Sequence, residues 1–299
     1  MVQQKFLEKA EILIEALPYI QRFNKKVIVI KCGGSVMENR DLEKSIIEDA
    51  VLLKLVGLKP VIVHGGGKEI SHWLEKMGIE PKFIKGLRFT DAPTLEIAEM
   101  ALAKVNGELV KFIEGLGVKA VGISGKSGHL LNAEKKLSKE DLGFVGKIKS
   151  VNGKVLTDLL ENDYLPVVYP IGIGDDGVEY NINADDAASE IAKELKTEKL
   201  AFLSDIPGLL KDLNNPESLI AEIYTDEAKK MIEEGSIKGG MLPKIKNCIE
   251  AIEAGVSRVH ILDGRIPHCL LLELFTDKGI GTAILSESEN KYYKDEEKE

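Results

Sequence analysis

Cysteine is scarce in this chain, which bears on both folding and location. The 299 residues include three cysteines, Cys32, Cys248 and Cys269. Their number is odd, and they lack the close pairs typical of zinc sites. We therefore expect no disulfide framework and no structural metal site, and we interpret the cysteines as buried, reduced thiols of a cytoplasmic protein.

Long apolar runs and excess positive charge are also missing. No stretch of ~18 uninterrupted apolar residues occurs, and the first ten residues contain Glu8 and lack the apolar segment of a secretory leader. The 49 acidic residues outnumber the 40 basic residues, which gives a net charge of −9. These features argue against secretion, a membrane span and a nucleic-acid partner, so we expect small-molecule partners.

The sequence instead has β-branched runs that alternate with amphipathic segments, which predicts an α/β fold with a largely parallel sheet. The expected strands are Val27–Ile30, Pro60–Val63, Lys119–Ile123, Leu165–Val168, Lys199–Leu203 and Arg258–Leu262. The expected helices are Leu42–Val56, Glu69–Met77, Thr94–Leu116, Lys154–Asn162, Asp185–Leu195, Thr225–Glu234 and Pro243–Ala254. Between residues 125–151 and 173–183, Gly and Asp-Gly turns predict hairpins over this sheet.

An amphipathic segment precedes the first strand. Its apolar residues recur at helical spacing, and Pro18 should kink the helix. These apolar residues are Phe6, Ala10, Leu13, Leu17 and Ile20. Two interpretations have equal weight: the helix packs on its own domain, or it is an oligomerisation arm.

Two glycine clusters follow the first two expected strands directly. They are Lys31-Cys32-Gly33-Gly34-Ser35 and His64-Gly65-Gly66-Gly67-Lys68. The carboxyl ends of parallel strands are where α/β sheets bind ligands, and glycine lets backbone N–H groups surround an anion. We expect these turns to bind phosphate.

Two other glycine motifs compete with these clusters. Gly172–Gly177 matches G-x-G-x-x-G, but it leads into no helix and carries two aspartates, so we interpret it as a hairpin turn. Ala120–Ser127 resembles a P-loop whose first glycine is alanine, and no convincing acidic strand end follows it to hold magnesium.

Two further segments begin helices. Asn181-Ile182-Asn183-Ala184-Asp185 has more amides and carboxylates than a helix cap requires, although Asn183 or Asp185 could serve as a cap. In Gly239-Gly240-Met241-Leu242-Pro243-Lys244, Lys244 opposes the helix dipole. A cation at that position favours a bound anion.

Together with Gly86-Leu87-Arg88-Phe89-Thr90-Asp91, these ordered motifs resemble the amino acid kinase family over the chain to about Ser286. The resemblance is greatest to the family branch that phosphorylates N-acetyl-L-glutamate and is inhibited by L-arginine. It implies a three-layer αβα sandwich with an oligomerisation helix (1–24), an acyl-substrate lobe (25–196) and a nucleotide lobe with the arginine site (197–286). The low-complexity composition of residues 287–299 separately predicts a disordered tail.

The resemblance also implies the reaction and its residues. ATP would phosphorylate the γ-carboxylate of N-acetyl-L-glutamate in the second step of arginine biosynthesis, with Mg²⁺ bound to the ATP and no resident metal. Lys31 and Lys244 would contact phosphoryl oxygens, and Asp185 would hold both lysines. The remaining implied contacts are N–H donors from Gly33, Gly34, Gly66 and Gly67, substrate binding by Arg88, Asn181 and Asn183, and nucleotide binding by Asp205 and Lys238.

Arginine control is implied by two features. The kinked N-terminal helix resembles the arm of ring-shaped hexamers built as trimers of dimers, and residues 268–282 resemble an effector signature. The expected arginine ligands are Glu273, Gly279, Lys211 and Tyr19. The family resemblance also leaves room for a nitrogen-signalling regulatory partner.

Two alternatives stay open. One is a sibling kinase that acts on another carboxylate or a carbamate, because the sequence does not display the acetyl pocket. The other is a catalytically weak arginine sensor on the same fold.

Overall fold

The structure, a computed structural model of the chain, describes residues 2–37, 39–212, 215–276 and 279–289. Its helices are α1 Val2–Glu15, α2 Leu17–Phe23, α3 Gly34–Met37, α4 Arg40–Leu55, α5 Gly67–Lys76, α6 Ala92–Gly115, α7 Gly153–Glu161, α8 Ala184–Leu195, α9 Thr225–Glu233, α10 Met241–Glu253 and α11 Cys269–Leu274. Its strands are β1 Val27–Cys32, β2 Lys59–His64, β3 Phe83–Ile84, β4 Leu87–Arg88, β5 Ala120–Ser124, β6 Leu131–Lys135, β7 Gly146–Val151, β8 Leu165–Tyr169, β9 Ile171–Ile173, β10 Glu179–Asn181, β11 Lys199–Ser204, β12 Glu222–Tyr224, β13 Arg258–Asp263 and β14 Thr282–Leu285.

Within the described residues, eight strands form the main sheet in the order β12-β14-β13-β11-β1-β2-β8-β5. Every neighbouring pair is parallel except β13 and β14. The predicted α/β class and mainly parallel sheet are confirmed, and each expected strand and helix begins and ends within two residues of its predicted limits.

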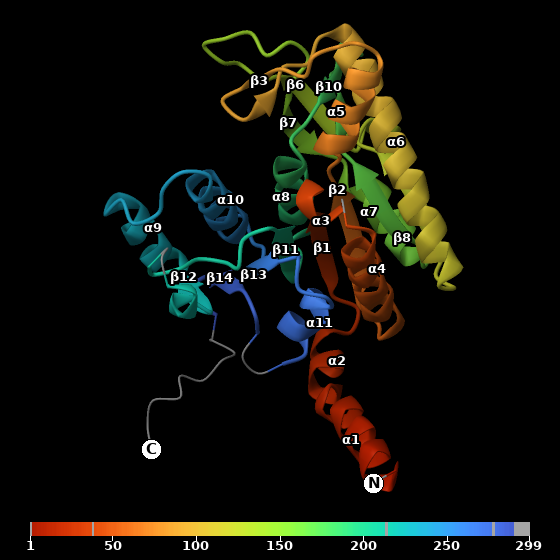
Figure 1. Cartoon of the computed structure of the whole chain (residues 1–299), viewed down its shortest axis with the longest axis vertical. Coiled ribbons are helices and arrows are strands. Elements are labelled where there is room, and N and C mark those ends of the chain that lie inside the picture. The colour runs from red at the N-terminus through yellow and green to blue at the C-terminus, as the bar shows by residue number, and fades with distance from the viewer. Residues whose placement is uncertain (1, 38, 213–214, 277–278, 290–299) are drawn as a thin grey trace.

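Alternation along the central strands places helices on both faces of this sheet. On β1, Ile28 and Ile30 pack with residues of α4, α6 and α11, whereas Val29 packs with residues of α8 and α10. Figure 1 shows these helices on either side of the strands. The expected three-layer sandwich is therefore present.

The segments predicted as hairpins form a separate small sheet with the order β10-β9-β6-β7. Together with the β3–β4 hairpin and α5, this sheet lies beyond the carboxyl ends of β1 and β2, at the top of Figure 1. Within Gly172–Gly177, Gly172 lies on β9 and residues 174–177 form the hairpin turn to β10, closed by hydrogen bonds from Gly174 N to Val178 O and from Gly177 N to Gly174 O. The interpretation of this motif as a turn is confirmed.

The N-terminal segment is helical and breaks before Pro18, as predicted, into α1 and α2. Helix α1 projects away from the body of the molecule (Figure 1), and the large apolar side chains described on it are exposed. Leu7, Ile12, Leu13 and Ile14 each expose more than 60% of their surface.

The three cysteines are buried and unpaired by disulfides, as expected. No helix among the described residues is both long and apolar enough to cross a membrane. The predicted tail falls mostly on 290–299, which lie outside the described residues, while Glu287 accepts hydrogen bonds from Thr225 Oγ1 and Asp226 N at the start of α9.

Candidate active site

The two glycine clusters meet at one edge of the main sheet because β1 and β2 are parallel neighbours with Cys32 opposite His64. Gly33 N donates to Leu203 O at 3.1 Å, and Gly65 N donates to Cys32 O at 3.2 Å. Each cluster leads into a helix, α3 or α5, so its next N–H groups lie at a helix N-terminus. This geometry suits an anion.

Lys31, Asp185 and Lys244 converge at this edge from β1, α8 and α10. Lys31 Nζ lies 2.6 Å from Asp185 Oδ1, and Lys244 Nζ lies 3.6 Å from Asp185 Oδ2. Strand alternation explains the placement: Lys31 is two residues from Val29 and shares its α8 side of the sheet. The structure thus brings together three charged residues that are far apart in the sequence.

The charges of this cluster stabilise one another. Burial raises the pKa of the Asp185 carboxyl, but the Lys31 and Lys244 ammonium groups outweigh burial and hold that pKa below its ordinary value. Asp185 is therefore an anion at neutral pH and offsets the repulsion between two cations. Its carboxylate is already paired, so it is a poor candidate for a metal ligand.

Arg88, on β4, is the buried cation on the other side of the glycine loop. Its Nη2 donates to Gly67 O at 2.5 Å and to Ser71 Oγ at 2.8 Å, and its guanidinium lies 4.7 Å from the centroid of the Phe83 ring. Its Nη1 is buried without a hydrogen-bond partner among the described residues. Burial lowers the pKa of Arg88, yet the group stays charged at neutral pH.

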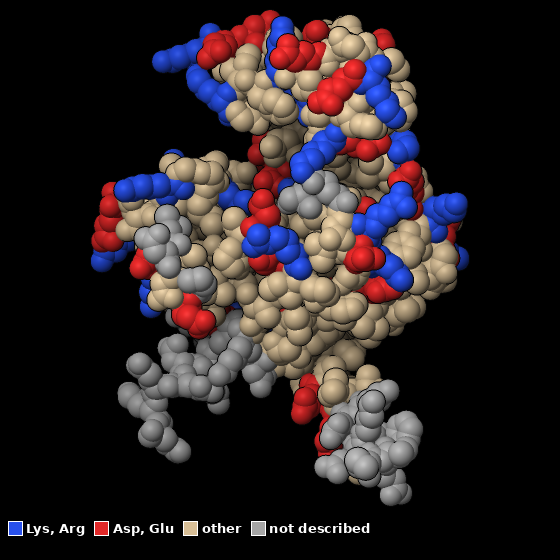
Figure 2. All heavy atoms as spheres, viewed as in Figure 1, with Lys and Arg blue, Asp and Glu red and all other residues tan. Residues whose placement is uncertain are grey.

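A cavity of about 490 Å³ joins Arg88 and the glycine loops to the two expected amides, and Ala184 in its lining directly precedes Asp185. Its lining includes Gly34, Gly66, Gly67, Arg88, Asn181, Asn183 and Asp205. Figure 2 shows the molecule hollowed between the upper part, with α5 and the small sheet, and the part that carries α9 and α10. Most of the predicted substrate residues therefore share one cavity.

The two asparagines are anchored differently. Asn183 is the N-cap of α8, since its Oδ1 accepts from Asp185 N at 2.8 Å and Asp186 N at 3.2 Å. The capping alternative is thus confirmed, and the Asn183 amide group is left as a donor toward the cavity that this residue lines. Asn181 Nδ2 donates to Thr90 Oγ1 at 3.2 Å.

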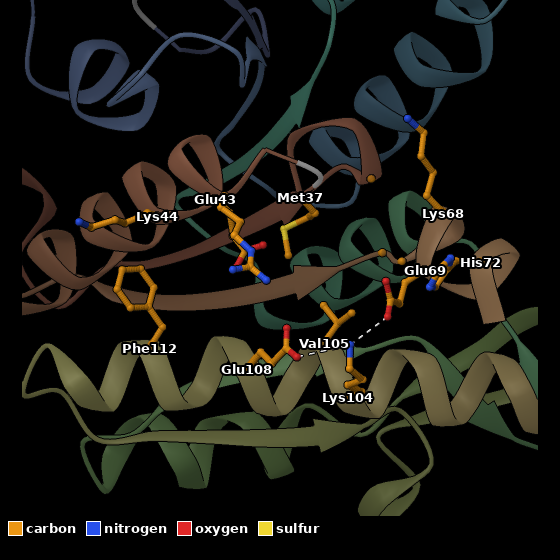
Figure 3. A pocket seen from close by; sticks show the side chains of 14 residues that line it. Met37, Glu43, Lys44, Lys68, Glu69, His72, Lys104, Val105, Glu108 and Phe112 are labelled. Carbon is orange, nitrogen blue, oxygen red and sulfur yellow. Dashed lines mark hydrogen bonds and ion pairs between the residues drawn. The ribbon is translucent and has the colours of Figure 1, made fainter. Parts of the chain in front are cut away.

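A larger cavity, of about 720 Å³, lies on the α4–α6 side of the glycine loops. Figure 3 shows Lys104 between Glu69 and Glu108, at 3.0 and 3.4 Å. Burial and the nearby Glu108 raise the pKa of Glu43 in the same cavity. Charges of both signs are compensated here, and Arg88, Asn181 and Asn183 are absent from the lining, so size alone does not identify the reaction site.

The P-loop-like segment is engaged elsewhere. Lys126 Nζ lies 2.6 Å from Glu99 Oε1 and 2.8 Å from Glu179 Oε1. Two carboxylates neutralise this lysine, which ties α6 to β10. The segment is therefore less suited to phosphate than the other two clusters.

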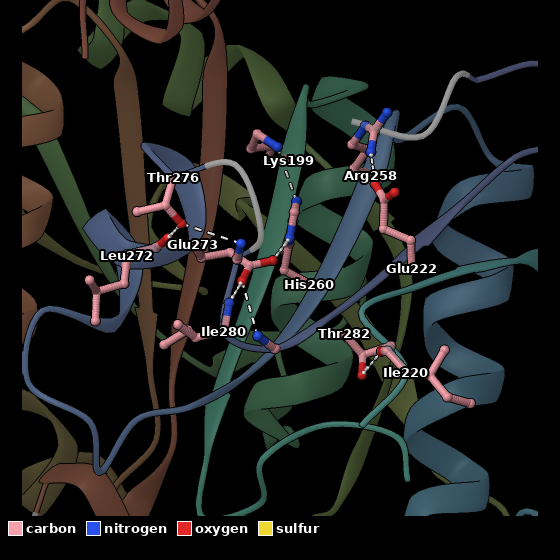
Figure 4. Close-up of polar contacts among 12 residues, drawn as sticks. Lys199, Ile220, Glu222, Arg258, His260, Leu272, Glu273, Thr276, Ile280 and Thr282 are labelled. Atoms are coloured by element: carbon pink, nitrogen blue, oxygen red, sulfur yellow. Dashed lines mark hydrogen bonds and ion pairs between the residues drawn. The ribbon is translucent and has the colours of Figure 1, made fainter. Parts of the chain in front are cut away.

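Glu273 lies in a buried polar network, 3% exposed. Its Oε1 accepts from His260 Nδ1 at 2.7 Å, its Oε2 accepts from Ile280 N at 2.7 Å and Gly281 N at 3.1 Å, and His260 Nε2 lies 3.1 Å from Lys199 Nζ (Figure 4). Burial raises the pKa of Glu273, and the His260 and backbone hydrogen bonds bring it below its ordinary value. Burial also lowers the pKa of Lys199 to about 7.

The residues expected around Glu273 are only partly gathered there. Tyr19, on α2, packs edge-on against Phe275, which directly follows α11, and Gly279 N donates to Thr276 Oγ1. Lys211 instead lines a separate cavity of about 620 Å³ between β12 and α9. Lys199 is the lysine in the Glu273 network, and a lysine that begins an otherwise apolar, buried strand is the sequence signal that could have identified it.

Lys238 is exposed in the turn before α10, away from the hydrogen bonds and ion pairs of the Lys31 cluster among the described residues. Sequence reasoning also missed Ser71 and Phe83, which hold the Arg88 guanidinium. Neither residue belongs to a recognisable sequence motif, because their contact with Arg88 depends on the β3–β4 hairpin folding back over α5.

Comparisons with known proteins agree with this geometry. The model of the amino acid kinase family matches residues 26–263. The acetylglutamate kinase of Caldanaerobacter subterraneus subsp. tengcongensis is 56% identical over 277 residues, 92% of this chain and 93% of that relative.

Solved structures share the fold. The N-acetylglutamate synthase of Neisseria gonorrhoeae, complexed with coenzyme A and N-acetyl-glutamate, has a TM-score of 0.81 and 27% identity over 94% of this chain, which spans only 64% of the synthase. The same synthase was solved with coenzyme A and L-arginine. Carbamate kinase from Giardia lamblia, 17% identical over 88% of this chain and 99% of that chain, has a TM-score of 0.66 and shows the common fold. The family resemblance is confirmed: the chain belongs to the amino acid kinase family, within its group of acetylglutamate kinases.

Proposed function

We propose that this protein transfers the γ-phosphoryl group of ATP to the γ-carboxylate of N-acetyl-L-glutamate, the second step of arginine biosynthesis, in the cytoplasm. The Lys31–Asp185–Lys244 cluster beside the two glycine loops is the observation that carries this proposal. A phosphoryl group in transfer carries dispersed negative charge, and fixed cations with backbone N–H donors stabilise it.

The chemistry needs no base. One γ-carboxylate oxygen bonds to the γ-phosphorus while the bond from that phosphorus to the bridging β,γ-oxygen breaks, and ADP leaves with the electron pair. Because a carboxylate is already ionised at pH 7, no proton moves. Lys31 and Lys244 then neutralise charge, while Gly33, Gly34, Gly66 and Gly67 supply N–H donors.

The acceptor fits the cavity of about 490 Å³. The Nη1 of Arg88, buried and without a hydrogen-bond partner in the described part of the chain, suits the α-carboxylate, because a guanidinium binds a carboxylate through parallel hydrogen bonds. Asn181 and Asn183 line the same cavity and would bind the acetylamino end. Arg88, Asn181 and Asn183 together favour N-acetyl-L-glutamate over a small carbamate as the phosphoryl acceptor.

ATP would approach from the C-terminal part of the chain, with Asp205 and Lys238 near its phosphates. The cavity of about 620 Å³ between β12 and α9 gives room for the base and ribose. Magnesium would enter as the ATP complex, held mainly by phosphate oxygens, since Mg²⁺ keeps several waters and takes few protein ligands.

The test is ADP release from MgATP with N-acetyl-L-glutamate, set beside L-glutamate, L-aspartate, carbamate and no acceptor. Turnover with acetylglutamate well above the other acceptors supports the proposal. Faster turnover with carbamate or aspartate would assign the chain to a sibling reaction, and no turnover with any acceptor would leave the arginine-sensor alternative.

Feedback inhibition by L-arginine is the second part of the proposal. Glu273 is a buried carboxylate of charge opposite to a guanidinium, Tyr19 and Lys199 lie in the same region, and a related synthase was solved with L-arginine. Replacing Glu273 by glutamine should raise the arginine concentration for half-inhibition at least ~10-fold, because a charge-assisted hydrogen bond is lost. The measurement is ADP release against arginine concentration.

The matched control is Glu114→Gln, an exposed carboxylate on α6. It should leave both turnover and inhibition unchanged. Unaltered inhibition in Glu273→Gln would remove Glu273 from the effector site.

We also propose a hexamer, built as a trimer of dimers through α1. The exposed apolar side chains of this projecting helix, Leu7, Ile12, Leu13 and Ile14, are the support. Replacing Ile12 and Leu13 by glutamate should reduce the mass in light scattering from six chains to two. A mass unchanged by these substitutions would contradict an interface through α1.

A further inference from the structure

His64 is a fully buried polar residue that the reaction itself does not use. It ends β2, immediately before the Gly65–Gly67 loop, and it is 0% exposed. Its Nδ1 lies 2.9 Å from Gly65 O, and its Nε2 lies 3.0 Å from Asn106 Nδ2 on α6. The His64 side chain therefore connects the Gly65–Gly67 loop to helix α6.

The partners fix the protonation of the ring. Asn106 Nδ2 also donates to Val167 O at 2.9 Å, and an amide oxygen in its place would face that carbonyl, so the NH₂ group must lie there. The Asn106 amide group therefore donates to Nε2, and the proton resides on Nδ1, which donates to Gly65 O. Burial lowers the pKa of His64 to about 4, so the ring is neutral at physiological pH.

The hydrogen bond from His64 Nδ1 to Gly65 O sets the direction of a backbone N–H donor in the candidate active site. Gly65 C=O and Gly66 N–H belong to one planar trans peptide, in which the two bonds point in opposite directions. Holding the carbonyl against the buried ring turns the Gly66 N–H away from it. Gly66 lines the candidate substrate cavity, and within the described chain no acceptor takes its N–H.

We propose that His64 and Asn106 are positioning residues for phosphoryl transfer, locking the Gly65–Gly66 peptide so that the Gly66 N–H faces the transferred group. The inference rests on the proposed function. Gly122 on β5 supports it, because a Cβ there would lie 1.8 Å from Asn106 Oδ1. Any larger residue at position 122 would therefore displace the Asn106 amide.

Two substitutions of His64 separate positioning from packing. In His64→Asn, the amide nitrogen takes the place of Nδ1 and still donates to Gly65 O. In His64→Gln, the amide reaches Asn106 instead and the donor to Gly65 O is lost. We expect His64→Gln to lower kcat at least ~10-fold, because misaligning one backbone donor forfeits part of the ~10²–10³-fold that such a donor supplies.

His64→Asn should keep kcat within about threefold of wild type, although asparagine fills less of the buried space than glutamine. The KM for N-acetyl-L-glutamate should stay within about twofold in both, because Arg88 holds the acceptor. If His64 only fills space in the core, kcat of His64→Gln should instead exceed kcat of His64→Asn. Equal losses in the two variants, the reverse order, or unchanged kcat in both would overturn the proposal.

A second pair tests Asn106 without changing it. Gly122→Ala should push the Asn106 amide and lower kcat at unchanged KM, while Gly107→Ala, beside Asn106 on α6 with nothing within 4 Å of its added Cβ, should not. Thermal unfolding of each variant identifies any that fail to fold. A wild-type protein without kinase turnover contradicts the proposed function, whereas an active wild type with indistinguishable glycine variants contradicts this inference.

Discussion

Replacing Lys31 or Lys244 by methionine is expected to lower kcat by at least ~10³-fold, the largest effect of any single substitution in this protein. Each ammonium group lies against Asp185, at 2.6 and 3.6 Å, so the three side chains carry one net positive charge, and losing one lysine leaves them neutral where phosphoryl oxygens must approach. The site then lacks the positive charge that stabilises the phosphoryl group in transfer. Steady-state ADP release with saturating acetylglutamate measures the effect.

A matched control is Lys111→Met, which removes an exposed lysine of α6 far from the cluster and should leave kcat unchanged. Lys31→Arg separates charge from geometry: it keeps the charge but not the compact ammonium group, so we expect partial activity. If kcat of Lys31→Met and Lys244→Met stayed within tenfold of wild type, the cluster would not be catalytic.

Replacing Arg88 by lysine is expected to raise the KM for N-acetyl-L-glutamate by about 30-fold, which corresponds to ~2 kcal/mol for lost charge-assisted hydrogen bonds. The Nη1 donor, which is buried and has no hydrogen-bond partner among the residues that the structure describes, disappears, and the lysine offers a single point charge to the carboxylate. Because Arg88 grips a part of the acceptor that does not react, kcat should change less than about threefold.

The KM for ATP is the internal control and should not move. Ser71→Ala removes one acceptor of Arg88 Nη2 and leaves Nη1 in place, so we expect a smaller rise in the acceptor KM. A rise in the KM for ATP with an unchanged acceptor KM would place Arg88 at the nucleotide instead.

Much of this site was predictable because its determinants are local. Buried β-branched runs define β1 and β2, and glycines directly after a strand define the loops, so the meeting of Gly33 and Gly66 at one sheet edge follows from parallel pairing. The pairing of Lys31 with Asp185 was expected from the family resemblance, and its cause is strand alternation. The capping role of Asn183 could be foreseen as an alternative, since asparagine favours that position.

The remaining contacts depend on tertiary packing that no local pattern carries. Lys199 rather than Lys211 joins the Glu273 network because β11 and β13 pair with Lys199 opposite Arg258, which brings it beside His260. The short strands β12 and β14 pair with each other across more than 50 residues of sequence, so neither shows a signal alone. His64 looked like part of a glycine cluster, and only the fold shows that its ring faces Asn106.

The most direct test of phosphoryl transfer to the γ-carboxylate is to trap the product. An acyl phosphate reacts with hydroxylamine to give a hydroxamate, which mass spectrometry identifies as the γ-hydroxamate of N-acetylglutamate. The account predicts one hydroxamate for each ADP released, only when MgATP and N-acetyl-L-glutamate are both present, and none with Lys244→Met. ADP release without the hydroxamate would contradict the account, because the phosphoryl group would then have gone to water or to another acceptor.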